Sequence, residues 1–156
     1  MDNRFAQLVE ALAPKLEYLL SCPPSKDGLL PRQMPKCGVY LFSEGSYHLY
    51  IGRSNVLRGR YGRHCRPGAT HRQASFAFQL AREMTGLKKA SYKIGSLSRA
   101  GLMLNPDFVE AFRRAKERIR CMDYRFVEET DQNSQALLEI YCAVVLNTPY
   151  NDFRTH

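Results

Sequence analysis

Two tyrosines and a dense group of basic residues lie close together in the first half of the chain. Tyr40 and Tyr50 stand in two short apolar runs, 38–42 and 48–52, with a polar turn at 43–46 between them. Such runs on either side of a turn predict a β-hairpin with one tyrosine on each strand. The basic residues in and after the second run include Arg53, Arg58, Arg60, Arg63, His64 and Arg66. Tyrosine hydroxyls beside guanidinium groups predict a site that handles phosphate.

The distribution of charge favours a polyanionic partner. The chain of 156 residues has a net charge of +8 at pH 7. No acidic residue occurs between Glu44 and Glu83, although basic residues recur throughout that stretch. A solvated helix face normally mixes both signs, so an acid-free basic segment indicates nucleic acid first and an acidic membrane second.

Six residues with defined spacing form a set that extends to the end of the chain. Tyr40 closes Gly38-Val39-Tyr40, Tyr50 opens Tyr50-Ile51-Gly52, and the set is Tyr40, Tyr50, Arg60, His64, Glu139 and Asn151. With these residues in this order, the chain resembles a GIY-YIG nuclease domain, in which Val39 replaces the isoleucine. The resemblance covers residues 36–66 and 122–153.

The resemblance implies metal-dependent hydrolysis of DNA. Glu139 would bind Mg²⁺ or Mn²⁺, because a hard divalent cation that keeps most of its waters needs only one or two carboxylates. Arg60 would contact the scissile phosphate, and Tyr50 would orient water or phosphate. Asn151 would hold the geometry of the site. Tyr40 is the general base that the resemblance implies. His64 is the competing base, because its ordinary pKa lies closer to neutrality, and the sequence leaves this choice open.

The remaining basic residues are expected to supply affinity. We expect contacts to the DNA backbone from Arg53, Arg58, Arg63, Arg66 and Arg72, with His71 beside them. Phosphate contacts of this kind give affinity without sequence readout. The alternatives are a catalytically silent DNA-binding module of the same fold, and a basic RNA-binding or membrane-surface protein. A homodimer, with the N-terminal helix as interface, would suit cleavage of both strands. Restriction, repair, recombination and homing roles all stay open.

The chain length indicates one domain that buries a sizeable core. We expect an α/β (α+β) fold with a small, mainly antiparallel three-stranded sheet flanked by helices. Residues 1–35 would form a helical extension and a proline-rich connector, and residues 67–121 a helical insertion. Periodicity predicts an N-terminal helix over 3–20 that Pro14 bends or splits.

Turn and capping signals define the other elements. The predicted strands cover 38–43, 47–53 and 122–128, and the predicted helices 55–65, 71–86, 105–120 and 134–146. Residues 91–104 could be a short strand or a loop. In the helix at 105–120, the residues expected to face inward are Phe108, Val109, Phe112 and Ile119.

The five cysteines and the hydropathy pattern complete the expectations. The cysteines are scattered without a C-x-x-C pair, so we expect reduced and mostly buried thiols, with Cys65 as the one candidate for reactivity. No apolar run approaches the length of about 20 residues that spans a membrane. The expected location is cytoplasmic, in association with the nucleoid.

Overall fold

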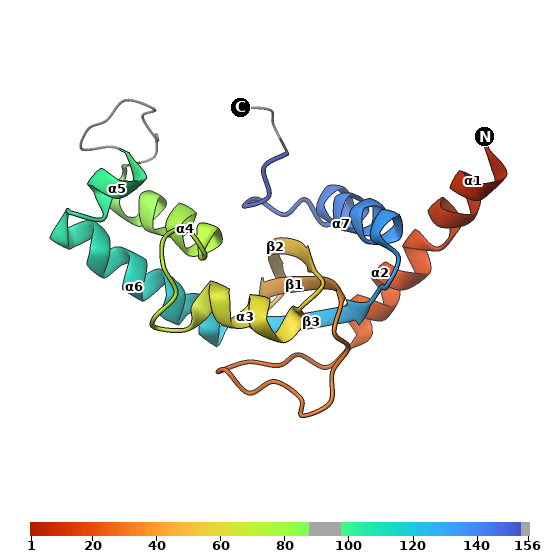
Figure 1. The fold of residues 1–156 in the computed structure, drawn as a ribbon, viewed down its shortest axis with the longest axis horizontal. Coiled ribbons are helices and arrows are strands. Elements are labelled where there is room, and N and C mark those ends of the chain that lie inside the picture. Colours follow the sequence, from red (N-terminus) through yellow and green to blue (C-terminus); the bar gives the residue numbers. More distant parts are fainter. Residues whose placement is uncertain (88–97, 154–156) are drawn as a thin grey trace. The chain divides into compact units, whose positions relative to one another are not determined.

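The computed structural model describes residues 1–87 and 98–153. The chain forms two compact units (Figure 1). The first unit combines Met1–Arg60 with Met122–His156, and the second consists of Tyr61–Cys121. The expected insertion at 67–121 lies within the helical second unit, whose first residue is Tyr61.

The first unit is built on a three-stranded sheet. β1 (Gly38–Glu44) lies between β2 (Tyr47–Ser54) and β3 (Asp123–Glu128), and both pairings are antiparallel. Gly45 takes a φ of +60° in the turn between β1 and β2, a conformation that glycine adopts without steric cost. The predicted α+β class with an antiparallel three-stranded sheet is confirmed.

Helices cover this sheet on one side. α1 (Asn3–Glu10) and α2 (Leu12–Ser21) replace the predicted N-terminal helix, which is split at Ala11 as one of the two expected outcomes. Pro14 lies in the first turn of α2, where its missing N–H leaves no helical hydrogen bond unmade. α7 (Gln132–Leu146) is capped by Asp131, whose carboxylate accepts the Ser134 N–H at 2.8 Å.

The core of the first unit lies between α2, α7 and one face of the sheet. Its buried members are Leu12, Leu16, Leu19, Val39, Leu41, Ile51, Val127, Leu138, Cys142 and Ala143. Because side chains alternate along a strand, Tyr40 and Phe42 of β1 face the other way. There they meet Tyr124 of β3, with ring centroids 5.7 and 5.0 Å away. The catalytic candidate Tyr40 is therefore part of an aromatic layer.

The connector between α2 and β1 extends the sheet locally. Ser25 and Tyr124 exchange two backbone hydrogen bonds of 2.8 and 2.7 Å, which add an isolated antiparallel bridge to the outer edge of β3. α3 (Leu57–Cys65) follows β2 and carries Arg60. Arg58 on α3 donates from its guanidinium to the carbonyl oxygens of Pro31 and Arg32, so it anchors the connector.

The second unit is helical. α4 (Ser75–Thr85) ends at Gly86, the last residue of the predicted helix, whose φ of +74° is typical of a glycine C-cap. α6 (Pro106–Cys121) packs against α4, with Phe78 of α4 5.0 Å from Phe108 between ring centroids. The predicted helices at these positions are confirmed.

Two expectations for the second unit are wrong. Residues 99–102 form a short helix, α5 (Arg99–Leu102), instead of a strand or loop, because Ser98 Oγ accepts the Gly101 N–H at 3.0 Å. The earlier part of that segment, 91–97, lies outside the described residues. Val109 is 40% exposed, since the buried stripe of α6 runs through Phe108, Phe112, Ala115 and Ile119.

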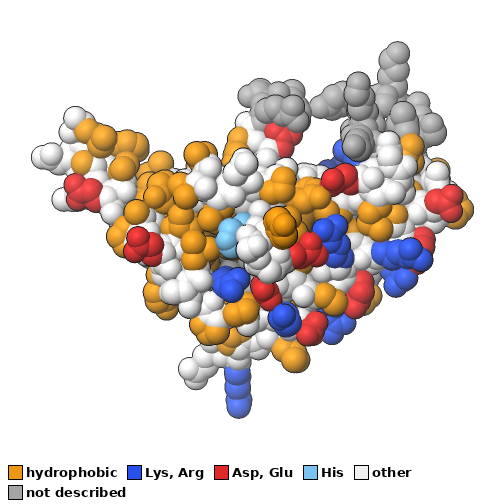
Figure 2. Space-filling view, turned by 180° about the vertical axis from the view of Figure 1, so that it is seen from behind, with side chains coloured by type: hydrophobic (Ala, Val, Ile, Leu, Met, Phe, Trp, Pro, Cys, Tyr) orange, Lys and Arg blue, Asp and Glu red, His pale blue; other side chains and the backbone are white. Residues whose placement is uncertain are grey.

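The two units differ strongly in charge. Tyr61–Cys121 contains 13 Lys and Arg residues against 4 Asp and Glu residues, a net charge of +9. The rest of the chain contains 10 against 11, a net charge of −1. The whole excess of positive charge therefore belongs to the second unit. On the face shown in Figure 2, blue and red side chains are interspersed, which is the ordinary pattern of a solvated surface.

The cysteine and membrane expectations have mixed outcomes. All five cysteines are free thiols, but only Cys65 and Cys142 are buried, so the prediction of mostly buried thiols is wrong. Among the described residues, no helix is long and apolar enough to cross a membrane.

Candidate active site

Both glycines of the tyrosine motifs are required by close packing. Tyr40 is 2% exposed and lies opposite Gly52 in the β1–β2 register. A Cβ at position 52 would lie 2.3 Å from the Tyr40 hydroxyl oxygen, which no side chain tolerates. A Cβ at position 38 would lie 1.9 Å from the Val127 carbonyl oxygen. The two glycines let Tyr40 lie flat on β2 and let β3 approach β1.

Tyr40 and Tyr50 form a coupled pair of phenols. Their ring centroids are 6.4 Å apart. Burial is the main cause that raises the pKa of Tyr40 well above its ordinary value, and Arg60 only partly offsets it. Burial and then Glu139 raise the pKa of Tyr50, against Arg60 and a hydrogen bond from Tyr40. Both side chains are therefore neutral phenols in the free protein at neutral pH.

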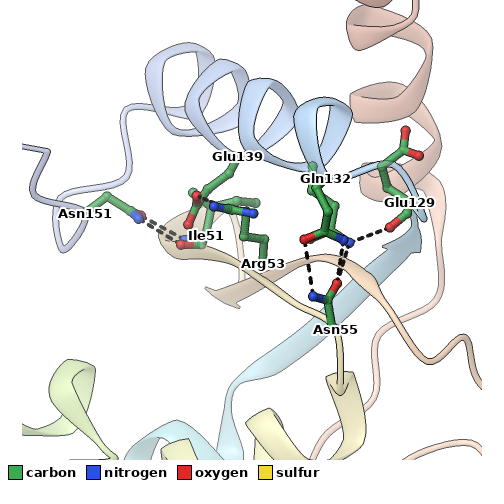
Figure 3. A network of polar contacts seen from close by, with 8 residues as sticks. Ile51, Arg53, Asn55, Glu129, Gln132, Glu139 and Asn151 are labelled. Atoms are coloured by element: carbon green, nitrogen blue, oxygen red, sulfur yellow. Dashed lines mark hydrogen bonds and ion pairs between the residues drawn. The ribbon is translucent and has the colours of Figure 1, made fainter.

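Glu139 reaches the same place from α7. Its carboxylate is 22% exposed, and Oε2 lies 3.3 Å from Arg53 Nε (Figure 3). Burial raises the pKa of Glu139, while Arg53 and Arg60 oppose the shift. The ion pair thus compensates the desolvation of this carboxylate incompletely, and a further cation beside it would stabilise the ionised form.

Arg60 has a buried hydrogen-bond donor that lacks a partner among the described residues. It is half-buried on α3, and its charge acts on Tyr40, Tyr50 and Glu139. Its Nε–H is buried without a hydrogen-bond partner within residues 1–87 and 98–153. An unmet buried donor costs about 1–3 kcal/mol, more in a charged group. An anion that presents acceptor oxygens to the guanidinium, such as a phosphate, would satisfy it.

Asn151 binds the outer edge of β2. Its Oδ1 accepts the Ile51 N–H at 2.9 Å and its Nδ2 donates to the Ile51 carbonyl at 2.8 Å (Figure 3). Thr148 Oγ1 donates to the same Oδ1 at 2.8 Å, which fixes the orientation of the amide. The Tyr150 N–H donates to the Leu49 carbonyl at 3.2 Å. The segment after α7 is thereby attached to the strand that carries Tyr50.

An amide network ties the start of α3 to α7. Asn55 and Gln132 exchange two side-chain hydrogen bonds of 2.8 and 3.2 Å, and Gln135 Nε2 donates to Asn55 Oδ1 at 3.1 Å (Figure 3). Gln135 also donates to the Glu129 carbonyl at 2.7 Å. The network fixes Arg60, one turn into α3, relative to Glu139. In the sequence Asn55 marks only the start of the predicted helix at 55–65, and no spacing signal pointed to its partners.

The predicted site residues fall into the two units. Tyr40, Tyr50, Arg53, Arg60, Glu139 and Asn151 belong to the first unit, where the structure brings them together. His64 belongs to the second unit, is 2% exposed and packs edge-on against Phe76 at 6.4 Å. Arg63, Arg66 and Arg72 are exposed in the second unit. Arg58 differs from these, because it also holds the connector.

Cys65 is a poor nucleophile. Burial raises the pKa of its thiol to about 11, so it is protonated at neutral pH. Its Sγ donates to the Tyr61 carbonyl at 3.2 Å within α3. The structure therefore gives no support to the reactivity considered for this residue.

The donor set suits a hard divalent cation held by one carboxylate. No group of three His, Cys, Asp or Glu residues that could hold a metal occurs in the part of the chain that the structure describes. The carboxylate of Glu139 and the hydroxyls of Tyr40 and Tyr50, which lie within electrostatic range of it, are all hard oxygen donors. Mg²⁺ is commonly bound by one or two carboxylates together with waters and substrate phosphates. The residues present fit such an ion.

Comparison with known proteins gives no further guide. No protein-family model, no curated protein and no solved structure matches the chain significantly.

Proposed function

We propose that this protein is a divalent-metal-dependent DNA endonuclease of the GIY-YIG type. The observation that carries the proposal is the convergence of Tyr40, Tyr50, Arg60 and Glu139, from two strands and two helices, within mutual electrostatic range. Their order and spacing in the sequence, and the packing need for Gly38 and Gly52, support it.

In this proposal Arg60 binds the scissile phosphate. Its unsatisfied Nε–H and its permanent charge meet the phosphoryl oxygens, where negative charge builds up in the transition state. Arg53 holds Glu139 in place through the 3.3 Å ion pair. The amide network of Asn55 fixes α3 relative to α7. Arg60 and Glu139 are therefore positioned before the substrate binds.

Glu139 would hold the metal ion. When bound, the Mg²⁺ or Mn²⁺ ion supplies Lewis-acid stabilisation of the phosphoryl oxygens and of the departing oxygen. Burial raises the pKa of Glu139 despite two neighbouring arginines, so a cation bound beside it would stabilise the ionised carboxylate.

Tyr40 is the proposed acceptor of the proton from the attacking water, in the phenolate form that it reaches by first releasing its own proton to solvent. Its burial opposes ionisation, and the charge of Arg60 favours the phenolate. His64 is the competing base, from the second unit. Tyr40→Phe and His64→Gln separate them: the variant that lacks the base loses about 10²–10⁴ in rate. Single-turnover rates measured against pH check this, and an unchanged rate in Tyr40→Phe would assign the role to His64.

The proposal is tested by incubating supercoiled plasmid with the protein and Mg²⁺, with and without EDTA. We expect nicked and linear products that EDTA abolishes. Binding of duplex DNA without any metal-dependent scission would indicate a catalytically silent module instead. Stronger competition by RNA than by duplex DNA at moderate salt would indicate the RNA-binding alternative.

A further inference from the structure

Two arginines of the second unit share one aromatic ring. The guanidinium carbon of Arg82, on α4, lies 4.6 Å from the centroid of Phe78. That of Arg99, on α5, lies 4.8 Å from the same centroid. Phe78 is fully buried and is held in turn by the rings of Phe108 and Phe112. Cation–π contacts with a fixed ring hold both guanidinium groups in place.

Two donors of Arg82 have no partner within residues 1–87 and 98–153. Its Nε and Nη2 are both buried and have no hydrogen-bond partner within the described residues. Burial and then Arg99 lower the pKa of Arg82, and no carboxylate contributes. Arg99 makes one hydrogen bond of 3.3 Å, from Nη1 to the His71 carbonyl. Among the described residues, two cations thus lie at one ring without a carboxylate paired to either of them.

The surroundings add positive charge. Burial, then Arg72 and then Arg99 lower the pKa of His71, whose ring lies 6.4 Å from Phe78 between centroids. Arg72 is exposed next to it. Four basic residues therefore create a positive electrostatic potential here. We call them the α4–α5 basic cluster: His71, Arg72, Arg82 and Arg99.

Three other cations of the same unit have partners. Arg113 and Arg114 on α6 pair with Glu110 at 2.7 and 3.1 Å. The side-chain hydrogen bond from Arg113 lowers the pKa of Glu110 to about 2. Lys116, only 6% exposed, donates to the carbonyls of Pro67 and Ala69 at 2.7 and 2.9 Å. Arg82 differs from these three cations because two of its donors have no partner in the described part of the chain, so charge density alone does not explain the missing partners.

We infer that the α4–α5 basic cluster is a binding site for a phosphodiester group of the DNA backbone, separate from the scissile phosphate. A phosphate offers acceptor oxygens to the unmet donors of Arg82 and cancels the repulsion between Arg82 and Arg99. The exposed side chain of Arg99 can adjust to admit it. The net charge of +9 in this unit attracts such a ligand. The inference rests on the proposed function for the nature of the polyanion.

The first test measures binding of duplex DNA in EDTA, so that cleavage is not needed. The slope of log affinity against log salt concentration is compared for the wild type, Arg82→Gln, Arg99→Gln and the control Arg113→Gln. Loss of one phosphate contact lowers the magnitude of the slope by about 0.9. We expect this decrease for Arg82→Gln and Arg99→Gln. Arg113→Gln should keep the wild-type slope, since Glu110 already neutralises Arg113.

An unchanged slope in Arg82→Gln and Arg99→Gln overturns the inference. If the wild type itself does not bind duplex DNA, the proposed function fails with it. If the wild type binds and cuts DNA while these slopes are unchanged, only the inference fails.

A second measurement does not depend on DNA or on the yield of one variant. The thermal unfolding midpoint is recorded in inorganic phosphate and in sodium chloride of equal ionic strength. We expect phosphate to raise the midpoint of the wild type more than that of Arg82→Lys or Arg82→Gln, because lysine lacks the planar fork. Equal responses in all three proteins contradict a phosphate site at Arg82. A response to phosphate without any change in DNA slope restricts the site to small anions and overturns the DNA assignment.

Discussion

The first unit and the second unit differ in net charge and in how many of their arginines have partners. In the first unit, with a net charge of −1, Arg53 pairs with Glu139 and Arg58 with backbone carbonyls. In the second unit, with a net charge of +9, Arg63, Arg66 and Arg72 are exposed and Arg82 has unmet donors. A site for chemistry needs fixed geometry, whereas affinity for a polyanion needs uncompensated charge. The contrast suggests that the chain separates these two tasks.

The largest effect should come from exchanging an arginine of the first unit for glutamine. Arg60→Gln removes the preorganised donor for the phosphate, so we expect the single-turnover rate to fall by about 10²–10³. Arg66→Gln, in the second unit, should keep the rate at saturating DNA and lower the salt slope by about 0.9. Rates and binding isotherms measured on the same duplex check both. An equal loss of cleavage rate in Arg66→Gln and Arg60→Gln would contradict the assignment of catalysis to the first unit and DNA affinity to the second.

The tight packing around Tyr40 gives the next largest effect. Gly52→Ala places a methyl group 2.3 Å from the Tyr40 hydroxyl oxygen, so we expect at least about 1–3 kcal/mol of lost stability and a displaced phenol. The control is Gly59→Ala on α3, where the nearest atom lies 4.0 Å away. There alanine should stabilise the helix by about 0.5–1 kcal/mol. Urea unfolding measures both free energies, and equal changes of one sign would show that position 52 is not constrained.

A smaller effect concerns the free energy of unfolding that is lost when the buried carboxyl group of Glu139 ionises. Its pKa is raised above the ordinary value of 4.5. The folded state therefore holds this proton more tightly than the unfolded state, and the free energy of unfolding decreases as pH rises through the raised pKa. Glu139→Gln lacks this loss. We expect the stability of the variant relative to the wild type to increase from pH 4 to pH 7, as followed by urea unfolding. A constant difference would contradict the raised pKa.

Local patterns predicted most of the elements. The hairpin, the break between α1 and α2 just before Pro14, the end of α4 at Gly86 and the helix after Asn105 depend on neighbours in the sequence, so spacing and capping residues reveal them. α5 escaped prediction because a single turn of helix has no periodicity, and its cap is one serine hydroxyl. Val144 and Ile140 on α7 are 71% and 47% exposed although they belong to an apolar run, because burial depends on which partner elements exist.

The site was predictable where a motif spans it and not where long-range polar contacts build it. Tyr40, Tyr50, Arg60 and Glu139 were expected together, and the structure brings them into electrostatic contact. The network of Asn55 with Gln132 and Gln135 joins residues 77 and 80 positions apart, and amides carry no spacing signal. The unmet donors of Arg82 were also hidden, since only packing reveals that an arginine lacks a partner.

The central claim is that Glu139 makes the first unit a metal-dependent nuclease. The most direct measurement compares single-turnover plasmid cleavage in Mg²⁺ by the wild type, Glu139→Gln and the matched control Glu128→Gln, an exposed glutamate on β3. We predict that Glu139→Gln binds DNA as tightly as the wild type and does not cut it, while Glu128→Gln cuts at the wild-type rate. Cleavage by Glu139→Gln at the wild-type rate would contradict the claim.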